Sequence, residues 1–116
     1  MKALFIILNK TEYLDEILSI LVKHNVKGAT IVDSQGMASA IVNNDITGIP
    51  LFGSLKLILK DRHPQNKTIF SVIHDEKILK KVVESITYLL RNEKEPGVVF
   101  MFTVPVGDIY LLKNNK

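Results

Sequence analysis

The chain has 116 residues, of which 47% are hydrophobic, enough to build one globular domain with a modest core. Its formal net charge is +3, and its 15 basic residues form no run typical of a nucleic-acid patch, so no nucleic-acid partner is expected. It has no cysteine, which excludes disulfides and thiol chemistry and agrees with a cytoplasmic location. No apolar run approaches the roughly 20 residues of a membrane span.

The first third of the chain predicts a strand, a helix and a second strand. Leu4–Leu8 is an unbroken apolar run of strand length. The next segment predicts a helix over 12–24, with Thr11 as its N-terminal cap and Asn25 as a left-handed stop. An apolar stripe at helical spacing runs along this helix and consists of Leu14, Ile17, Leu18, Leu21 and Val22. A strand over Ala29–Asp33 follows.

The second half repeats this order. The stretch "NKTIFSVI", residues 66–73, predicts a strand, and Asp75 then caps a helix. The apolar stripe of that helix comprises Ile78, Leu79, Val82, Val83, Ile86 and Leu89. The stretch "EKEPG" predicts a turn, Val98–Val104 predicts a further strand, and Ile109–Leu112 predicts a short final strand.

The order β-α-β, connector, β-α-β predicts an α+β fold: a ferredoxin-like antiparallel sheet with both helices on one face, in a single domain over 1–116. A sheet covered on one face should alternate apolar and polar residues. Leu4–Leu8 and Val98–Val104 are instead apolar at odd and even positions alike. Because no helix is left to cover the second face, we expect other copies of the chain to bury it. The sequence thus predicts an oligomer.

The connector, Gln35–Gln65, is too long for a simple turn between paired strands. Its first half is rich in small and polar residues, so Met37–Ile49 is expected to be poorly ordered without a ligand. Its second half has apolar residues at helical spacing and predicts a short helix over Leu55–Lys60. Long loops in compact domains are usually functional or disordered, which makes the connector a candidate effector element.

The sequence offers no constellation for catalysis or metal binding. The three histidines have no ligand spacing, and a helix terminus, a loop and a position before a cap account for them. Asp75 and Glu76 lie in a first helical turn, where capping explains a pair of carboxylates. The stretch "RNEKE", residues 91–95, is interpreted as solvated helix surface. No nucleophile-elbow, P-loop, dinucleotide or metalloprotease motif occurs, so we do not expect an enzyme.

Four glycines lie at predicted strand edges: Gly28, Gly36, Gly97 and Gly107. Turn geometry accounts for each of them singly. A binding role requires several to converge on one cleft, where backbone amides can approach a ligand without a blocking side chain. At Gly36 we expect a positive φ, which a β-branched side chain would strain.

The stretch "VKGATIVDSQGM", residues 26–37, resembles the strand-two signature of the PII signalling family (the nitrogen regulatory protein PII superfamily). It matches the signature in register at five positions: Val26, Lys27, Gly28, Thr30 and Gly36. "KTIFSVIHDEKILKKVVESI" resembles the family's third strand and second helix, and "VVFMFTVPV" resembles its fourth strand. The likeness covers nearly the whole chain apart from the connector.

This resemblance implies a homotrimer of ferredoxin-like subunits, with clefts between neighbours in which an adenine nucleotide binds. It implies that the backbone at Gly28 and Ala29, with the hydroxyl of Thr30, meets the adenine. Gly36 and Met37 then begin the long loop, and a phosphate-facing turn contains the equivalent of Gly97. The family also implies a regulated partner, either a membrane transporter or an enzyme.

Several positions depart from the family pattern. Ser39 and Ala40 replace an Arg-Gln pair that helps to hold a metal and 2-oxoglutarate, so neither ligand is supported. The phosphate-binding lysine falls at Phe100. Of two later arginines, one becomes Leu111 and the other is retained as a charge at Lys113. The connector contains no tyrosine, which excludes uridylylation there.

Three functions follow as hypotheses. The leading one is a small-ligand sensor that regulates a partner protein by reordering its connector. The first alternative is a CutA-like trimer associated with divalent metal tolerance, although the chain has no cysteine and no aromatic-rich strand motif of that family. The second alternative is a small amino-acid-binding regulatory module.

Overall fold

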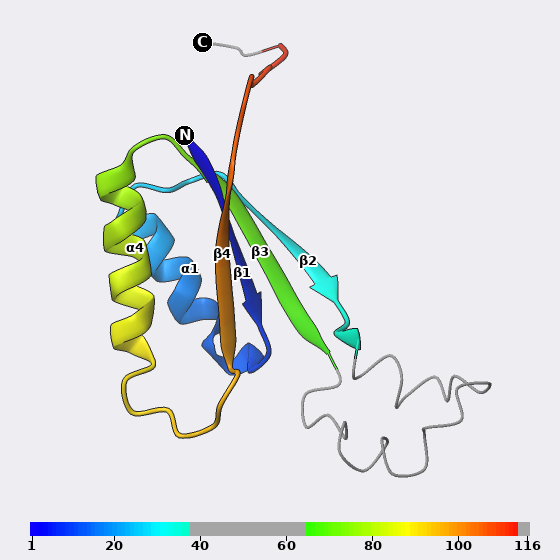
Figure 1. The fold of residues 1–116 in the computed structure, drawn as a ribbon, viewed down its shortest axis with the longest axis vertical. Coiled ribbons are helices and arrows are strands. Elements are labelled where there is room, and N and C mark those ends of the chain that lie inside the picture. Colours follow the sequence, from blue (N-terminus) through cyan, green and yellow to red (C-terminus); the bar gives the residue numbers. More distant parts are fainter. Residues whose placement is uncertain (38–64, 114–116) are drawn as a thin grey trace, which may run out of the picture.

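The structure, a computed structural model, describes residues 1–37 and 65–113. In these ranges two helices pack on one side of a four-stranded antiparallel sheet (Figure 1). The elements are β1 (Lys2–Leu8), the 3-10 turn η1 (Thr11–Tyr13), α1 (Leu14–Lys23), β2 (Ala29–Ser34), β3 (Asn66–Ile73), α4 (Glu76–Leu89) and β4 (Val99–Pro105). The strand order is β2-β3-β1-β4, and every neighbouring pair is antiparallel. The predicted α+β class is confirmed, and the arrangement is compatible with a ferredoxin-like fold.

The hydrophobic core lies between the sheet and the two helices. Leu4, Ile6 and Leu8 alternate along the central strand β1 and are at most 2% exposed. Opposite them, the apolar stripes of the helices contribute further fully buried side chains, namely Ile17, Leu21, Val82 and Ile86. Each such side chain contributes about 1.5 to 3 kcal/mol by leaving water, so this layer dominates the stability of the domain.

The start of α1 differs from the prediction. Thr11 was expected to cap the helix, but it begins the 3-10 turn η1, and the residue preceding α1 is Tyr13 without a side-chain capping bond. The backbone N–H of Tyr13 donates to the carbonyl of Lys10 at 3.2 Å, which closes this tighter turn. The expected cap of α4 is confirmed, because Asp75 accepts the backbone N–H of Lys77 at 2.8 Å.

The end of α1 confirms the predicted left-handed stop. Asn25 has φ 69°, and its N–H donates to the carbonyl of Val22 at 2.9 Å. The N–H of the buried Val26 reaches back to the carbonyl of Leu21 at 2.8 Å. These two bonds form a Schellman motif, which ends the helix and directs the chain into β2.

The predicted final strand over Ile109–Leu112 is wrong. In the described chain β4 ends at Pro105, which pairs with Lys2, and the segment that follows runs past the end of the sheet (Figure 1). A strand needs a neighbouring ladder for its backbone, and here the described residues supply none. The side chains of this segment are 47 to 79% exposed.

Most connector predictions fall outside the described residues. These include the short helix over Leu55–Lys60, the replacements at Ser39 and Ala40, and the low order expected of Met37–Ile49 apart from Met37 itself.

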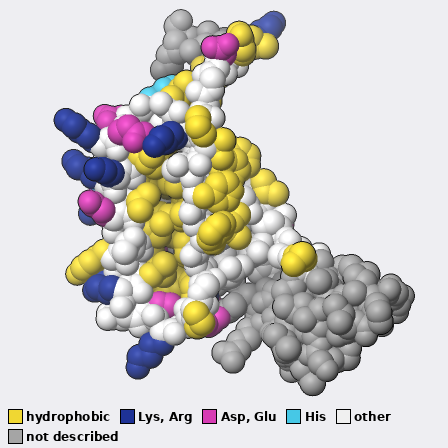
Figure 2. Space-filling model, in the orientation of Figure 1, with side chains coloured by type: hydrophobic (Ala, Val, Ile, Leu, Met, Phe, Trp, Pro, Cys, Tyr) yellow, Lys and Arg dark blue, Asp and Glu magenta, His cyan; other side chains and the backbone are white. Residues whose placement is uncertain are grey.

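The second face of the sheet, away from the helices, is apolar and aromatic. Phe5 of β1 pairs with Phe70 of β3 and with Phe102 of β4, at ring-centroid distances of 5.5 and 5.0 Å. Phe100 adds a fourth ring, 5.7 Å from Phe102. These four residues define the phenylalanine face. Figure 2 shows hydrophobic side chains gathered over the strands and charged side chains over the helices.

The phenylalanine face is open to solvent in the single chain. Phe100 is 61% exposed and Phe102 is 39% exposed. The expectation that both faces of the sheet are apolar is therefore confirmed, and no described helix covers the second one.

Candidate functional site

A cavity of about 360 Å³ lies where β2 begins and β3 ends. The α1–β2 and β3–α4 connections form its walls. The lining residues are Asn25, Val26, Lys27, Gly28, Ser71, Val72, Ile73, His74, Asp75 and Ile78. We call this the Gly28 cavity. Its volume lies at the lower end of the range for small-ligand sites.

Half of the ten residues that line the Gly28 cavity carry polar side chains, and two of these side chains are already engaged. Ser71 donates its hydroxyl to the carbonyl of Gly28 at 2.7 Å, which ties the two walls together. The carboxylate of Asp75 caps α4. Lys27 and His74 are exposed on the rim, so the cavity offers one permanent cation and one imidazole to a ligand.

The described glycines differ in the space around them and in their backbone φ angle. A Cβ added at Gly28 would meet nothing within 4 Å, and one at Gly36 would meet only the amide nitrogen of Asn66, at 3.8 Å. The expected positive φ at Gly36 is wrong, because Gly97 alone among the described glycines lies in the left-handed region, at φ 69°. Among the described glycines, Gly97 alone therefore has a backbone conformation that favours glycine, whereas Gly28 lines the cavity at a position where a Cβ would meet no other atom.

The predicted ligand-binding residues fall into two groups at opposite ends of the sheet. Gly28 and Thr30 lie at the start of β2, with Ala29 between them, whereas Gly36 and Met37 follow its end about 20 Å away. Thr30 pairs with Phe70 and so faces the helix-free side.

The remaining two candidates divide between the same ends. Gly97 precedes β4, which starts at the Gly36 end of the sheet. Lys113 lies beyond β4, past the other end, exposed and with φ 60°. Within one described chain the two groups do not form a single cleft.

Sequence reasoning missed a network of polar side chains that joins the Gly36 end of all four strands. Asn66 accepts the hydroxyl of Ser34, and its amide donates to Asn9 at 3.0 Å. Asn9 in turn donates to the carbonyl of Gly97 at 2.8 Å. We call Ser34, Asn66 and Asn9 the asparagine network. Because Asn66 is only 6% exposed, the network holds the segment before Gly36 and the Gly97 turn in a defined relation.

The stretch "RNEKE" is not simply solvated surface, as was expected. The side chain of Glu93 is 11% exposed, accepts the hydroxyl of Tyr13 at 2.6 Å and pairs with Lys10 at 3.0 Å. It also accepts the backbone N–H of Glu95 at 3.0 Å. These donors, the Tyr13 hydroxyl foremost, lower the pKa of Glu93 to about 2. The same bond to Glu93 raises the pKa of Tyr13.

Two histidines lie where the sequence placed them. His24 ends α1, with its Nε2 3.0 Å from the hydroxyl of Ser85, and His74 precedes the α4 cap. His63 lies outside the described residues. Within residues 1–37 and 65–113 no three His, Cys, Asp or Glu side chains gather closely enough to hold a metal ion. In the same ranges no helix has the length and apolar character needed to cross a bilayer.

Comparison with known proteins gives no family. No protein-family model matches the chain, and no curated protein matches its sequence. Function is therefore inferred from the residues and their geometry alone.

Proposed function

We propose that the chain is a PII-like regulatory protein. It assembles as a homotrimer, binds a small ligand at the subunit boundaries and regulates a partner protein, a transporter or an enzyme, through the connector 35–65. The observation that carries this proposal is the Gly28 cavity, because Val26, Lys27 and Gly28, the first residues of the stretch that resembles the PII signature, line it. The glycine there also leaves room for a ligand, since a Cβ at Gly28 would point into open space.

The phenylalanine face supports the assembly. Exposed apolar patches of this kind are rare on monomers and are usually buried in an interface. Covering the phenylalanine face with two further copies would bury Phe100 and Phe102, and it would bring the Gly28 end of one copy within reach of a neighbour. Such contact is what a ligand needs in order to touch Gly28 in one copy and Gly97 in the next.

The charges near the Gly28 cavity favour an anionic ligand, with an adenine nucleotide as the first candidate. Lys27 lines the cavity, and Lys113 follows the strand that ends at the same side of the sheet. A permanent cation attracts a phosphate group, and the attraction weakens as salt screens it. Phe100 stands where the PII pattern has a phosphate-binding lysine, so the phosphate contacts rest on Lys27 and Lys113.

Calorimetric titration with ATP, ADP, divalent metals and amino acids tests the proposal. We expect the wild-type protein to bind a nucleotide and Gly28→Val to lose that binding, because valine adds bulk at a residue that lines the cavity, while its Cβ meets no other part of the chain. Gly107→Val is the matched control, since it adds the same side chain in open space outside the cavity. Lys113→Ala should weaken binding and flatten its salt dependence.

Each other outcome has a distinct meaning. Binding of a divalent metal alone would favour the CutA-like alternative, and binding of an amino acid alone would favour the amino-acid module. If Gly28→Val and Gly107→Val bind the nucleotide as the wild type does, the site is not at the Gly28 cavity and the proposal fails.

A further inference from the structure

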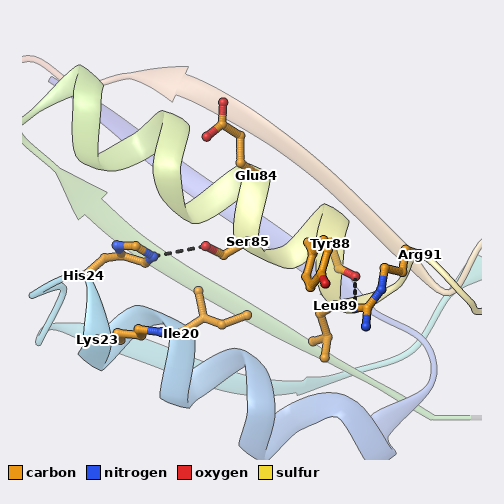
Figure 3. A pocket seen from close by; sticks show the side chains of 8 residues that line it. All are labelled: Ile20, Lys23, His24, Glu84, Ser85, Tyr88, Leu89 and Arg91. Atoms are coloured by element: carbon orange, nitrogen blue, oxygen red, sulfur yellow. Dashed lines mark hydrogen bonds between the residues drawn. The ribbon is translucent and has the colours of Figure 1, made fainter.

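A second cavity, of about 430 Å³, lies between α1 and α4 (Figure 3). It is lined by Ile20, Lys23, His24, Glu84, Ser85, Tyr88, Leu89 and Arg91. We call it the helix groove. It lies on the helix side of the sheet, opposite the phenylalanine face, and shares no lining residue with the Gly28 cavity. An assembly built on the phenylalanine face therefore leaves it open.

The helix groove has an apolar base and an aromatic wall. Ile20 of α1 and the half-buried Leu89 of α4 supply aliphatic surface. The ring of Tyr88 is 65% exposed, and the guanidinium carbon of Arg91 lies 3.8 Å from its centroid. Arg91 also donates through Nη1 to the carbonyl of Tyr88 at 2.8 Å. The guanidinium is thus held in place, with its remaining N–H groups available for a planar acceptor.

The charged side chains that line the helix groove are two cations and one carboxylate. Lys23 and Arg91 are permanent cations at the edges of the groove, and His24 and Ser85, joined at 3.0 Å, bridge the two helices. Glu84 is the one acidic residue of the lining, and Figure 3 shows its carboxylate directed away from α1. A ligand that enters the groove therefore meets apolar surface flanked by positive charge.

From this arrangement we propose that the helix groove binds a small organic monocarboxylate with an apolar body. The body covers Ile20 and Leu89, and the carboxylate pairs with Arg91, whose fork matches two carboxylate oxygens. Inorganic phosphate has no apolar body to cover Ile20 and Leu89, so we expect it to bind more weakly than such a monocarboxylate. The volume suits a ligand of roughly drug-fragment size.

The test is an amide NMR titration of the whole chain with phenylbutyrate, the probe, and with the neutral phenylbutanol and inorganic phosphate for comparison. We expect saturable shifts at Ile20, Ser85 and Tyr88 with phenylbutyrate and weaker or no binding of the other two. Arg91→Gln should weaken phenylbutyrate binding about tenfold, the loss of one charge-assisted contact. Lys80→Gln is the matched control, because it removes an exposed positive charge from α4 outside the groove.

Several outcomes would overturn the proposal. If phenylbutanol binds as tightly as phenylbutyrate, the carboxylate does not contribute to binding. If phosphate binds more tightly than phenylbutyrate, the proposed class of anion is wrong. Shifts that cluster around Gly28, or an equal loss in Arg91→Gln and Lys80→Gln, would remove the groove as the site. Spectra of both variants with the dispersion of the wild type establish that each remains folded.

Discussion

The two faces of the sheet are built from the same kinds of side chain but have different surroundings. On β1, Leu4, Ile6 and Leu8 lie under the helices and are at most 2% exposed, whereas Phe5 and Ile7, which alternate with them, face the side without helices and are only half-buried. Hydrophobicity alone thus does not decide which residues form the core of a single chain. The amphipathic helices decide it, because they cover one face and leave the other exposed in the single chain.

The largest expected effect is the loss of stability when a side chain is truncated on the helix-covered face of the sheet. Ile6→Ala should lower the free energy of unfolding by about 2 to 5 kcal/mol, because it leaves a cavity in a fully buried layer. Ile7→Ala, the same change one residue along on the open face, should cost clearly less at low protein concentration. Urea unfolding of the two variants checks this. Equal losses at nanomolar concentration would mean that the two faces are equally buried in the single chain.

The next largest effect concerns assembly through the phenylalanine face. Phe102→Lys places a charge beside Phe5, where a neighbouring copy would have to desolvate it. Light scattering at micromolar concentration should show a trimer for the wild-type protein and a monomer for the variant, with far-UV circular dichroism unchanged. A wild-type monomer under these conditions would contradict the proposed homotrimer.

A smaller loss of stability is expected from a change in the asparagine network. Asn66→Ala removes the buried side chain that joins Ser34 to Asn9, and the side-chain oxygen of Asn9 loses the amide that donates to it. This should destabilise the fold by about 1 to 3 kcal/mol. Hydrogen exchange should also speed up at Gly97, since Asn9 loses its fixed orientation. Loss of stability without faster exchange at Gly97 would show that the network does not couple the two segments.

The smallest expected effect is a pH-dependent change in stability, which comes from Glu93 on the helix side of the sheet. The pKa of Glu93 is about 2 in the folded chain, below its ordinary value of 4.5, because Tyr13 and the other donors favour the carboxylate. Its contribution to stability is therefore full above about pH 4.5 and is lost as the pH falls toward 2. The stability difference between the wild type and Glu93→Gln should follow this course in thermal unfolding. A difference that stays constant from pH 7 to pH 3 would contradict it.

The elements that depend on local sequence could be predicted, and those that depend on distant partners could not. The left-handed stop at Asn25 and the cap at Asp75 are short-range signals, and the structure confirms both. Thr11 failed as a cap because the turn before α1 is closed by Lys10 and held by Glu93, some 80 positions away along the chain. The final strand failed because apolar residues predict a strand but do not supply its neighbour.

The candidate site shows the same division. The position of Gly28 at a strand entrance follows from the sequence, but the cavity beside it forms only because the β3–α4 connection lies opposite. The asparagine network gave no sequence signal, since Asn9 and Asn66 each look like ordinary loop residues next to a strand. The geometry at Gly36 was mispredicted because glycine permits a positive φ without requiring one.

The strand order also has a consequence for how this chain reaches its fold. β1, the first strand along the sequence, pairs only with β3 and β4, the last two, and β2 reaches β3 across the whole connector. Among the four described strands no neighbouring pair is a local hairpin, so each of these pairings requires the closure of a long loop before it contributes any contact. During synthesis the apolar residues of β1 remain without a partner strand until β3, which ends at Ile73, is available, and the edge strand β4 follows later. Folding is therefore expected to be slow for a chain of this size, and α1 is the first element able to shield β1 while the sheet is incomplete.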